Sequence, residues 1–261
     1  VDEDLGEELD RGHEGRPVAE ELIPILALES VAAAEDGVPV ALAESGGSVE
    51  VENDDLCAVL SERGGGGTAK SLSFLEIFHE LARIETERRV HAAQELVKQL
   101  LEKQETSTEV ETKGFPGCFK ELAYALKRLI RGLLSARDAA RQGFSLGLFN
   151  ILSTEQLAST INVSDLFQKV AEIMNLPTSA KRQDIRESYF AKIAFFMTLH
   201  RAGVLRRKDV RDKHLPSAAQ QLVQMAQKKP YLREVCLELL AQIGTTVPVD
   251  VLESAILPPA A

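Results

Sequence analysis

The stretch from Tyr124 to Leu148, YALKRLIRGLLSARDAARQGFSLGL, contains two helical patterns that meet at a tight corner. In the first pattern the apolar residues recur on one face at about 100° per residue, and the basic residues occupy the opposite face. The apolar set is Leu122, Leu126, Leu129, Ile130 and Leu133. Gly132 loosens the end of this helix, and Asp138 lies in the first turn of the next one, where a carboxylate complements free N–H groups. The stretch therefore predicts a helix–corner–helix unit.

The second helix of this unit is apolar on more than one side. Phe144, Leu148 and Ile151 share one face, while Leu146 and Phe149 point in other directions. A helix of this kind is usually covered by neighbours on several sides. We therefore expect it to be the inner helix of a stacked layer, with the Phe144 ring buried between layers.

Similar patterns before and after this unit predict further helices. They cover residues 73–81, 86–103, 164–176, 179–202, 216–228 and 230–243, and a marginal segment covers residues 248–256. Ser73 with Glu76 forms a capping box, Gly203 is placed to end a helix, and Pro216 and Pro230 stand at plausible first helical positions. No convincing strand is present. Hairpins of about 35–45 residues favour an all-α, HEAT/armadillo-like α-solenoid of stacked helical hairpins over a compact bundle.

Charge is unevenly distributed along the 261 residues. Residues 1–62 contain 18 acidic side chains and two arginines, whereas the remaining residues contain 22 acids and 28 bases. Residues 1–70 are rich in Glu, Asp, Gly and Ala and contain no aromatic residue, so they cannot bury enough apolar surface to offset chain entropy. We predict a disordered acidic segment with a glycine-rich linker over residues 1–70. Residues 71–261 then form the helical-repeat domain, as a fragment of a longer solenoid.

One near-motif for nucleotide binding occurs at the end of the acidic segment. Residues 64–71, GGGGTAKS, match a phosphate-binding loop except that Ala69 replaces a glycine. A phosphate loop needs a preceding strand and a parallel sheet, and the sequence downstream offers helices only. We therefore interpret the segment as a linker, and we expect no cofactor.

The sequence lacks the patterns that catalysis or metal binding requires. Its three cysteines are far apart without a Cys-x-x-Cys pair, and its five histidines are scattered. No nucleophile elbow, kinase motif set or paired-carboxylate motif is present. No apolar run approaches the roughly 20 residues of a membrane span. The sequence thus predicts a non-enzymatic protein with no metal, small-molecule substrate or membrane partner.

Clustered basic residues are the more informative polar feature. The candidate surface for nucleic acid or a protein partner consists of Lys127, Arg128, Arg131, Arg206, Arg207 and Lys208. Smaller clusters occur at residues 181–182 and 228–229. Such residues can neutralise a phosphate backbone, although basic stripes are also common on solvated helix faces. Arg137 and Arg141 share the arc of Phe144, so we expect them to stack on the preceding helix or to pair with an acid there.

The stretch from Tyr124 to Leu148 resembles the N-terminal signature of the Myb-binding protein 1A and DNA polymerase V (polymerase phi) family. Residues 74–101, which include ETERR at 85–89 and AAQEL at 92–96, are similar to that family's opening hairpin. Residues 186–205 resemble its following helices. The resemblance covers about residues 72–243, and its central motif is the specific part.

This resemblance implies a nucleolar protein of the nucleus that acts in rDNA transcription and ribosome biogenesis. It implies a scaffold or regulator whose partners are transcription factors and ribosome-assembly factors, with rDNA or RNA as a further partner. One alternative is a DNA polymerase or nucleotidyltransferase, as the family's name suggests, although no Asp-x-Asp motif occurs in residues 71–261. The other alternative is a generic helical-repeat adaptor.

Overall fold

The computed structural model describes residues 72–107, 109–177 and 179–249. These residues form helices and turns, and the only β pairing among them is an isolated bridge between Val110 and Phe119. The predicted all-α class is therefore confirmed. The acidic segment predicted over residues 1–70 lies outside the described residues, as does most of the marginal segment 248–256.

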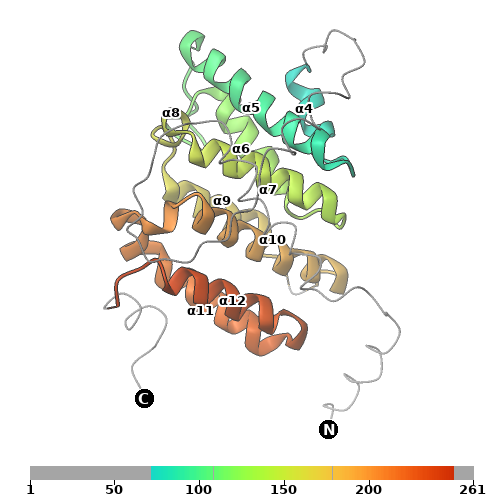
Figure 1. Ribbon diagram of the computed structural model, residues 1–261, viewed down its shortest axis with the longest axis vertical. Helices are drawn as coiled ribbons and strands as arrows, with labels where there is room; N and C mark the ends of the chain where they lie inside the picture. Colours follow the sequence, from blue (N-terminus) through green and yellow to red (C-terminus); the bar gives the residue numbers. More distant parts are fainter. Residues whose placement is uncertain (1–71, 108, 178, 250–261) are drawn as a thin grey trace, which may run out of the picture.

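The helices follow one another as four hairpins, each made of a first helix, a corner and a second helix (Figure 1). The first helices are α4 (Phe74–Glu80), α6 (Lys120–Gly132), α9 (Val163–Met174) and α11 (Lys208–Lys228). The second helices are α5 (Thr86–Thr106), α7 (Asp138–Ser153), α10 (Arg182–Arg201) and α12 (Arg233–Gly244). The shorter elements are α8 (Glu155–Ala158) and the 3-10 helices η1 (Val204–Arg206) and η2 (Pro230–Leu232).

The hairpins stack along the long axis of the molecule, from α4–α5 at one end to α11–α12 at the other (Figure 1). The second helices form one layer, in which α7 packs against both α5 and α10, and α10 contacts α12. The first helices form the other layer, in which α9 contacts both α6 and α11. Each hairpin thus buries its apolar faces against its neighbours, an arrangement consistent with an α-solenoid.

Local sequence signals explain where several helices begin and end. Ser73 and Glu76 form the predicted capping box, since the Ser73 N–H donates to the Glu76 carboxylate (2.8 Å) and the Glu76 N–H to Ser73 Oγ (3.4 Å). Gly203 ends the helical run after α10 with a φ of +70°, a conformation that glycine adopts without strain. These termini are therefore encoded locally.

Helix α7 is the buried centre of the stack, as its two-sided apolar pattern predicts. Phe144 is 8% exposed, and its ring lies directly against Gly132, where any side chain would clash with it. One residue earlier, Gly143 faces the carbonyl of Leu81 so closely that a Cβ atom would fall well inside van der Waals contact with the oxygen. Two glycines thus permit the close approach of α7 to the elements around it.

A buried arginine connects α7 to the next hairpin. Arg141 is 2% exposed, donates hydrogen bonds to the Ser135 carbonyl (2.8 Å) and the Glu187 carboxylate (2.7 Å), and pairs with Asp138. Its guanidinium lies over the Phe190 ring, 4.9 Å from the centroid. The predicted pairing with an acid is therefore confirmed, but Glu187 belongs to the following helix α10 rather than to the preceding one.

Arg89 has the corresponding position in α5. It donates to the carbonyls of Arg83 (3.0 Å) and Ile84 in the preceding corner, and to Thr86 Oγ1 (2.9 Å). It also donates to Gln142 Oε1 of α7 at 3.1 Å. In two successive hairpins, then, an arginine in the first turn of the second helix binds the corner of its own hairpin. The same arginine also contacts the second helix of the next hairpin.

One predicted boundary is wrong. Helix α11 begins at Lys208, and Pro216 lies inside it instead of at its first position. Val210 and Leu215 are buried and continue the apolar face upstream of the proline. Pro216 and Asp212, whose carbonyl loses its helical donor, are both exposed, so water can bind that carbonyl. Burial of the upstream face outweighs the missing hydrogen bond.

Phe144→Ala tests how far the stack depends on this ring. We expect the free energy of unfolding to fall by about 3–5 kcal/mol, because a large buried side chain is removed. Leu75→Ala is the control, since Leu75 is 61% exposed and its loss should change stability by less than about 0.5 kcal/mol. Urea denaturation of both variants measures the difference, and equal small effects would place Phe144 at the surface.

Gly143→Ala tests the close approach of α7 to the first corner. In an exposed helix this change stabilises by about 1 kcal/mol, whereas here we expect destabilisation by about 1–3 kcal/mol because Cβ collides with a backbone carbonyl. Ser145→Ala is the matched control in the same helix turn. It removes a buried hydroxyl that has no hydrogen-bond partner among the described residues, and it should leave stability equal or slightly higher. A stabilised Gly143→Ala protein in thermal denaturation would contradict the packing.

Candidate nucleic-acid interface

Helix α6 carries three of the predicted basic site residues, and two of them have no polar partner in the described part of the chain. Arg128 and Arg131 are exposed on the face opposite the buried apolar residues of α6, and the described residues offer them no ion-pair or hydrogen-bond partner. Two unpaired arginines one turn apart can both contact an acidic or phosphate-bearing partner.

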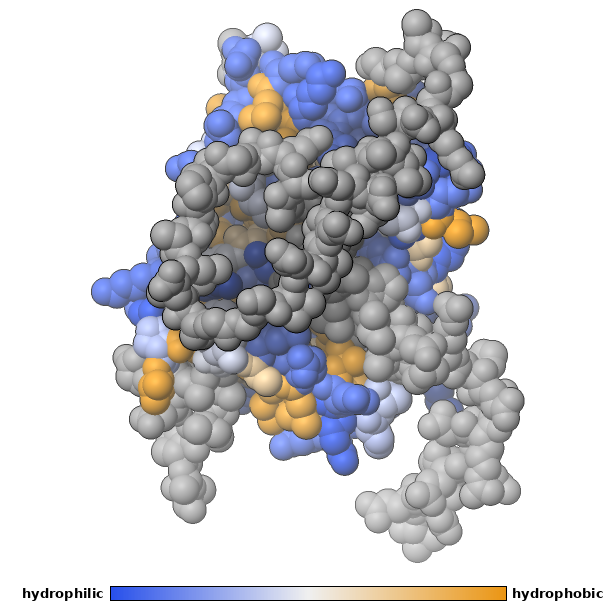
Figure 2. All heavy atoms as spheres, in the orientation of Figure 1, coloured by the Kyte–Doolittle hydropathy of each residue, from blue (hydrophilic) through white to orange (hydrophobic). Residues whose placement is uncertain are grey.

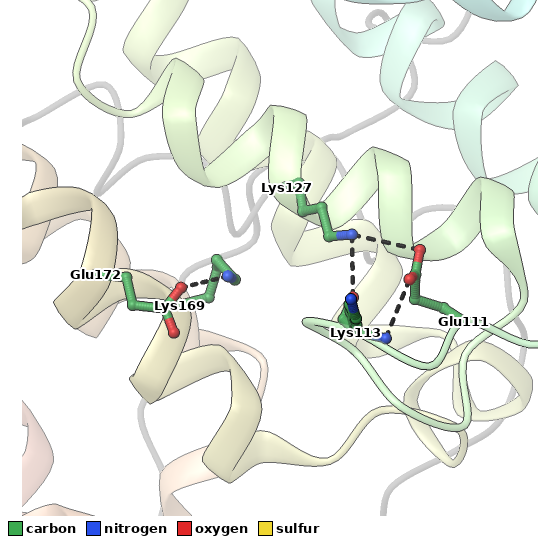
Figure 3. Close-up of polar contacts among 5 residues, drawn as sticks. All are labelled: Glu111, Lys113, Lys127, Lys169 and Glu172. Atoms are coloured by element: carbon green, nitrogen blue, oxygen red, sulfur yellow. Dashed lines mark hydrogen bonds and ion pairs between the residues drawn. The ribbon is translucent and has the colours of Figure 1, made fainter.

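Lys127 is instead held by the loop that precedes α6 (Figure 3). Its Nζ pairs with the Glu111 carboxylate at 3.3 Å and donates to the Lys113 carbonyl at 3.3 Å. The pKa of Glu111 lies below its ordinary value, mainly because the Lys113 N–H donates a hydrogen bond to this carboxylate and secondly because Lys127 does so. The Glu111 carboxylate is therefore charged. Lys127 is therefore a loop-binding residue rather than part of a free basic surface.

Arg206, Arg207 and Lys208 lie where η1 meets α11, and all three are exposed. Arg207 pairs with Asp209 at 3.3 Å. The connection from α10 to α11 lies at the opposite side of the stack from the α6–α7 corner (Figure 1), because the chain reverses direction at every helix pair. The two predicted clusters are thus not brought together.

The alternating chain direction gives the stack two edges. The corner edge, at the right of Figure 1, contains the turns inside the hairpins, at residues 81–85, 133–137, 175–181 and 229–232, with the adjoining helix ends. The return edge, at the left, contains the connections between hairpins, at residues 107–119, 154–162 and 202–207. The basic residues of the two edges differ in how they are paired.

On and beside the return edge, most basic side chains have acidic partners. Within the described chain, these pairs are Lys103–Glu121, Lys120–Glu109, Lys127–Glu111, Arg207–Asp209 and Arg211–Asp212. Their positive charge is therefore largely compensated locally. Surface pairs of this kind contribute little to stability, but they reduce the field that a negative partner meets.

Beyond the first hairpin, where Arg83 and Arg88 pair with Glu80, several exposed basic residues of the corner edge have no ion-pair partner in the described chain. Among the described residues, the bases of this edge without an ion-pair partner are Arg128, Arg131, Arg137, Lys181, Arg182, Lys228, Lys229 and Arg233. The acids of this edge outside ion pairs are Glu85, Glu87, Asp184 and Glu234. Unpaired positive charge thus exceeds unpaired negative charge along this edge.

Packing places the middle corners side by side. Arg141, near the start of α7, binds Glu187, near the start of α10, so the N-terminal ends of these two helices are adjacent. Arg137 and Lys181 immediately precede these two helices, and Arg182 is the first residue of α10. The corner edge therefore presents a row of basic residues across successive hairpins, which suits an extended polyanion.

Sequence reasoning identified parts of this edge but did not join them. Residues 181–182 and 228–229 were visible as small basic clusters, whereas Arg137 was expected to hold neighbouring layers together and is instead exposed. These residues share an edge because the chain direction alternates from helix to helix. In a stack of hairpins, the corners inside successive hairpins lie on the same edge, so the order of the predicted helices is the signal that could have placed these residues together.

Groups suited to other chemistry are few in the described chain. No cluster of three His, Cys, Asp or Glu side chains able to hold a metal ion occurs there. His214 stacks on Phe167, with ring centroids 4.3 Å apart, and contacts Ser164 Oγ at 2.9 Å. The pKa of His214 is lowered, mainly by burial and secondly by the positive charge of Lys213. Burial raises the pKa of Cys118 to about 11 and of Cys236 to about 12, which makes both thiols unreactive near neutral pH.

Extended apolar surface is not apparent on the face shown in Figure 2. Where the described residues are visible, hydrophilic side chains predominate and the apolar ones form small, separate patches. No described helix is long and apolar enough to cross a membrane. Charge is therefore the more distinctive property of the described surface.

The fold and the charged edge place the chain among helical proteins built from stacked hairpins. A family model described as DNA polymerase phi matches residues 124–260, more than half of the sequence. The chain therefore belongs to the DNA polymerase phi family, in agreement with the resemblance of residues 124–148. No solved structure matches the chain.

Curated relatives are similar at modest identity. The rDNA transcriptional regulator pol5 of Schizosaccharomyces pombe is 29% identical over 129 residues, covering 49% of this chain and 13% of the relative. Myb-binding protein 1A of Mus musculus is 30% identical over 179 residues, covering 68% of this chain and 12% of the relative. The chain thus corresponds to about an eighth of the length of these relatives.

Proposed function

We propose that the chain is part of a non-enzymatic nucleolar scaffold that regulates rDNA transcription and takes part in ribosome biogenesis. The observation that carries the proposal is family membership, together with relatives named as rDNA transcriptional regulators and as a Myb-binding protein. The partners proposed are transcription factors and ribosome-assembly factors, with the nucleus and nucleolus as the location. The stacked hairpins support it because they provide extended surfaces without requiring a catalytic centre.

The hairpins are proposed to be repeats of the HEAT or armadillo kind. Support comes from the equivalent placing of Arg89, Arg141 and Arg186, each near the start of a second helix. The first two bind the following second helix, and Arg186 joins Arg141 on the Phe190 ring, at 5.1 Å from the centroid. A side-chain position that recurs in successive units, and that in Arg89 and Arg141 also joins one unit to the next, is a property of repeat proteins.

The corner edge is the surface proposed for rDNA or RNA. Its unpaired arginines and lysines would release counterions on binding a phosphate backbone, which gives affinity without sequence specificity. Sequence recognition would then come from the protein partners. Arg206 and Lys208 on the return edge remain a second predicted contact, but their surroundings contain more compensating acids.

Neutralisation of three arginines tests this surface. In the full chain, R128A/R131A/R137A should reduce the slope of log K against log salt for duplex DNA by about 2–3, because each phosphate contact contributes about 0.9. R206A/R207A/K208A is the matched control with the same charge change and should reduce the slope by less than about 1. Fluorescence anisotropy between about 50 and 200 mM salt measures both. A larger effect of the control triple would move the interface to the return edge.

Two experiments test the proposed scaffold against the polymerase alternative. Affinity purification of the chain from nuclear extract should enrich rDNA-transcription and ribosome-assembly factors relative to a Phe144→Ala chain, whose stack is destabilised. Primer extension with magnesium and dNTPs should give no product. Extension activity, or saturable ATP or dNTP binding lost in Lys70→Ala, would overturn the scaffold in favour of a nucleotide enzyme. Enrichment of vesicle-transport proteins instead would favour a generic adaptor.

A further inference from the structure

We propose that the acidic segment of residues 1–62 docks on the corner edge of its own chain, where it occupies the surface that a polyanionic partner would use. The inference concerns charge within this chain and does not depend on the identity of any partner. It assigns an occupant to the unpaired bases from Arg128 to Arg137 and at residues 181–182.

Charge complementarity is the first argument. Residues 1–62 contain 18 acids and two arginines, and residues 72–249 contain 26 bases and 20 acids. One part of the chain is thus strongly negative and the other has a positive excess. Opposite charges on segments of one molecule attract without the loss of overall translational freedom that two separate molecules incur.

The pairing pattern decides where the acidic segment docks. Most bases on and beside the return edge already have acidic partners, for example Lys120 with Glu109 and Lys127 with Glu111. Arg128, Arg131 and Arg137 have none among the described residues and are exposed. An incoming carboxylate at the return edge would meet existing acids, whereas at the corner edge it meets free guanidinium groups, which bind carboxylates in a bidentate manner.

The connection is long enough to reach this edge. Residue 72 lies against α5, where Gln99 Nε2 donates to the Leu72 carbonyl at 2.7 Å. The preceding residues 63–71 can extend to about 30 Å, at roughly 3.3–3.6 Å per residue. Packed helices lie about 8–10 Å apart, so the α6–α7 and α9–α10 corners are one or two hairpins away. Both edges are within reach, and charge rather than tether length selects between them.

Tethering makes weak contacts effective. A tether of this length would hold the segment at a local concentration of the order of millimolar. Exposed ion pairs that are individually weak can then keep the edge occupied at low salt. A nucleic acid with a higher charge density can displace the segment, so docking would select against weakly charged competitors.

The chain offers a natural labelling position for a test. Cys57 lies close to Asp54 and Asp55 in the acidic segment, while the buried thiols of Cys118 and Cys236 have raised pKa values and should resist maleimide. A benzophenone maleimide attached to Cys57 in the full chain is photoactivated at low salt, and the cross-linked peptides are mapped by mass spectrometry. We expect cross-links within residues 128–140 and 179–190 to exceed those within 202–215 by about tenfold. Cys57→Ser reports background labelling.

Charge reversal provides the control. R128E/R131E/R137E should reduce the corner-edge cross-links by about tenfold, and K181E/R182E should reduce them by a smaller factor, whereas R206E/R207E/K208E should leave them unchanged. Salt near 1 M should also remove them, because it shortens the Debye length to about 3 Å. Circular dichroism checks that each variant is folded. If the R128E/R131E/R137E variant does not fold, the K181E/R182E variant still tests the proposal.

Three results would overturn the proposal. The first is cross-linking spread evenly over the surface, and the second is cross-linking unaffected by reversal of the corner-edge charges. The third is cross-linking to an isotopically heavy chain in a mixed sample, which would make the occupant a second copy. None of these readouts requires nucleic-acid binding or partner capture, so they remain informative even if the proposed function fails.

Discussion

The stack depends on buried arginines that join one hairpin to the next. Without Glu187 the buried charge of Arg141 would keep only the partly exposed Asp138 as an acidic partner, so the need to pair that charge holds α7 and α10 in one relative position. Arg89 fixes α5 to α7 with a neutral partner, Gln142. Apolar burial provides most of the driving force for stacking, but it is non-directional. These polar contacts specify the register of neighbouring hairpins.

Because the register is fixed, the corners of successive hairpins align. This alignment converts bases that are scattered along the sequence into one edge. Arg137 and Arg182 are 45 positions apart in the sequence. Arg137 stands at the start of α7 and Arg182 at the start of α10, and these two helix starts are adjacent in the stack. The charge pattern is thus a consequence of the packing, and the same bases on helices in another register would be dispersed.

Most of the fold was predictable because its signals are local. Apolar periodicity identified the helices, and Ser73, Glu76 and Gly203 marked their ends correctly. Pro216 misled because its helical penalty is local, whereas the burial of Val210 and Leu215 that overcomes it depends on the assembled stack. The candidate site was less predictable. Helix periodicity indicated that Lys127 faces away from the core, but only the path of the preceding loop shows that Glu111 neutralises it.

The closeness of α7 to the first hairpin has a geometric consequence for the whole molecule. Gly143 shortens the distance between hairpins on one side of the stack, and among the described residues no comparable glycine tightens the layer of first helices between α4 and α6. When successive hairpins lie closer together on one side of a stack than on the other, the stack curves toward the closer side. The close approach at Gly143 therefore favours curvature of the stack toward the side of the second helices, and such curvature would set how widely the basic corners are spaced along a bound chain.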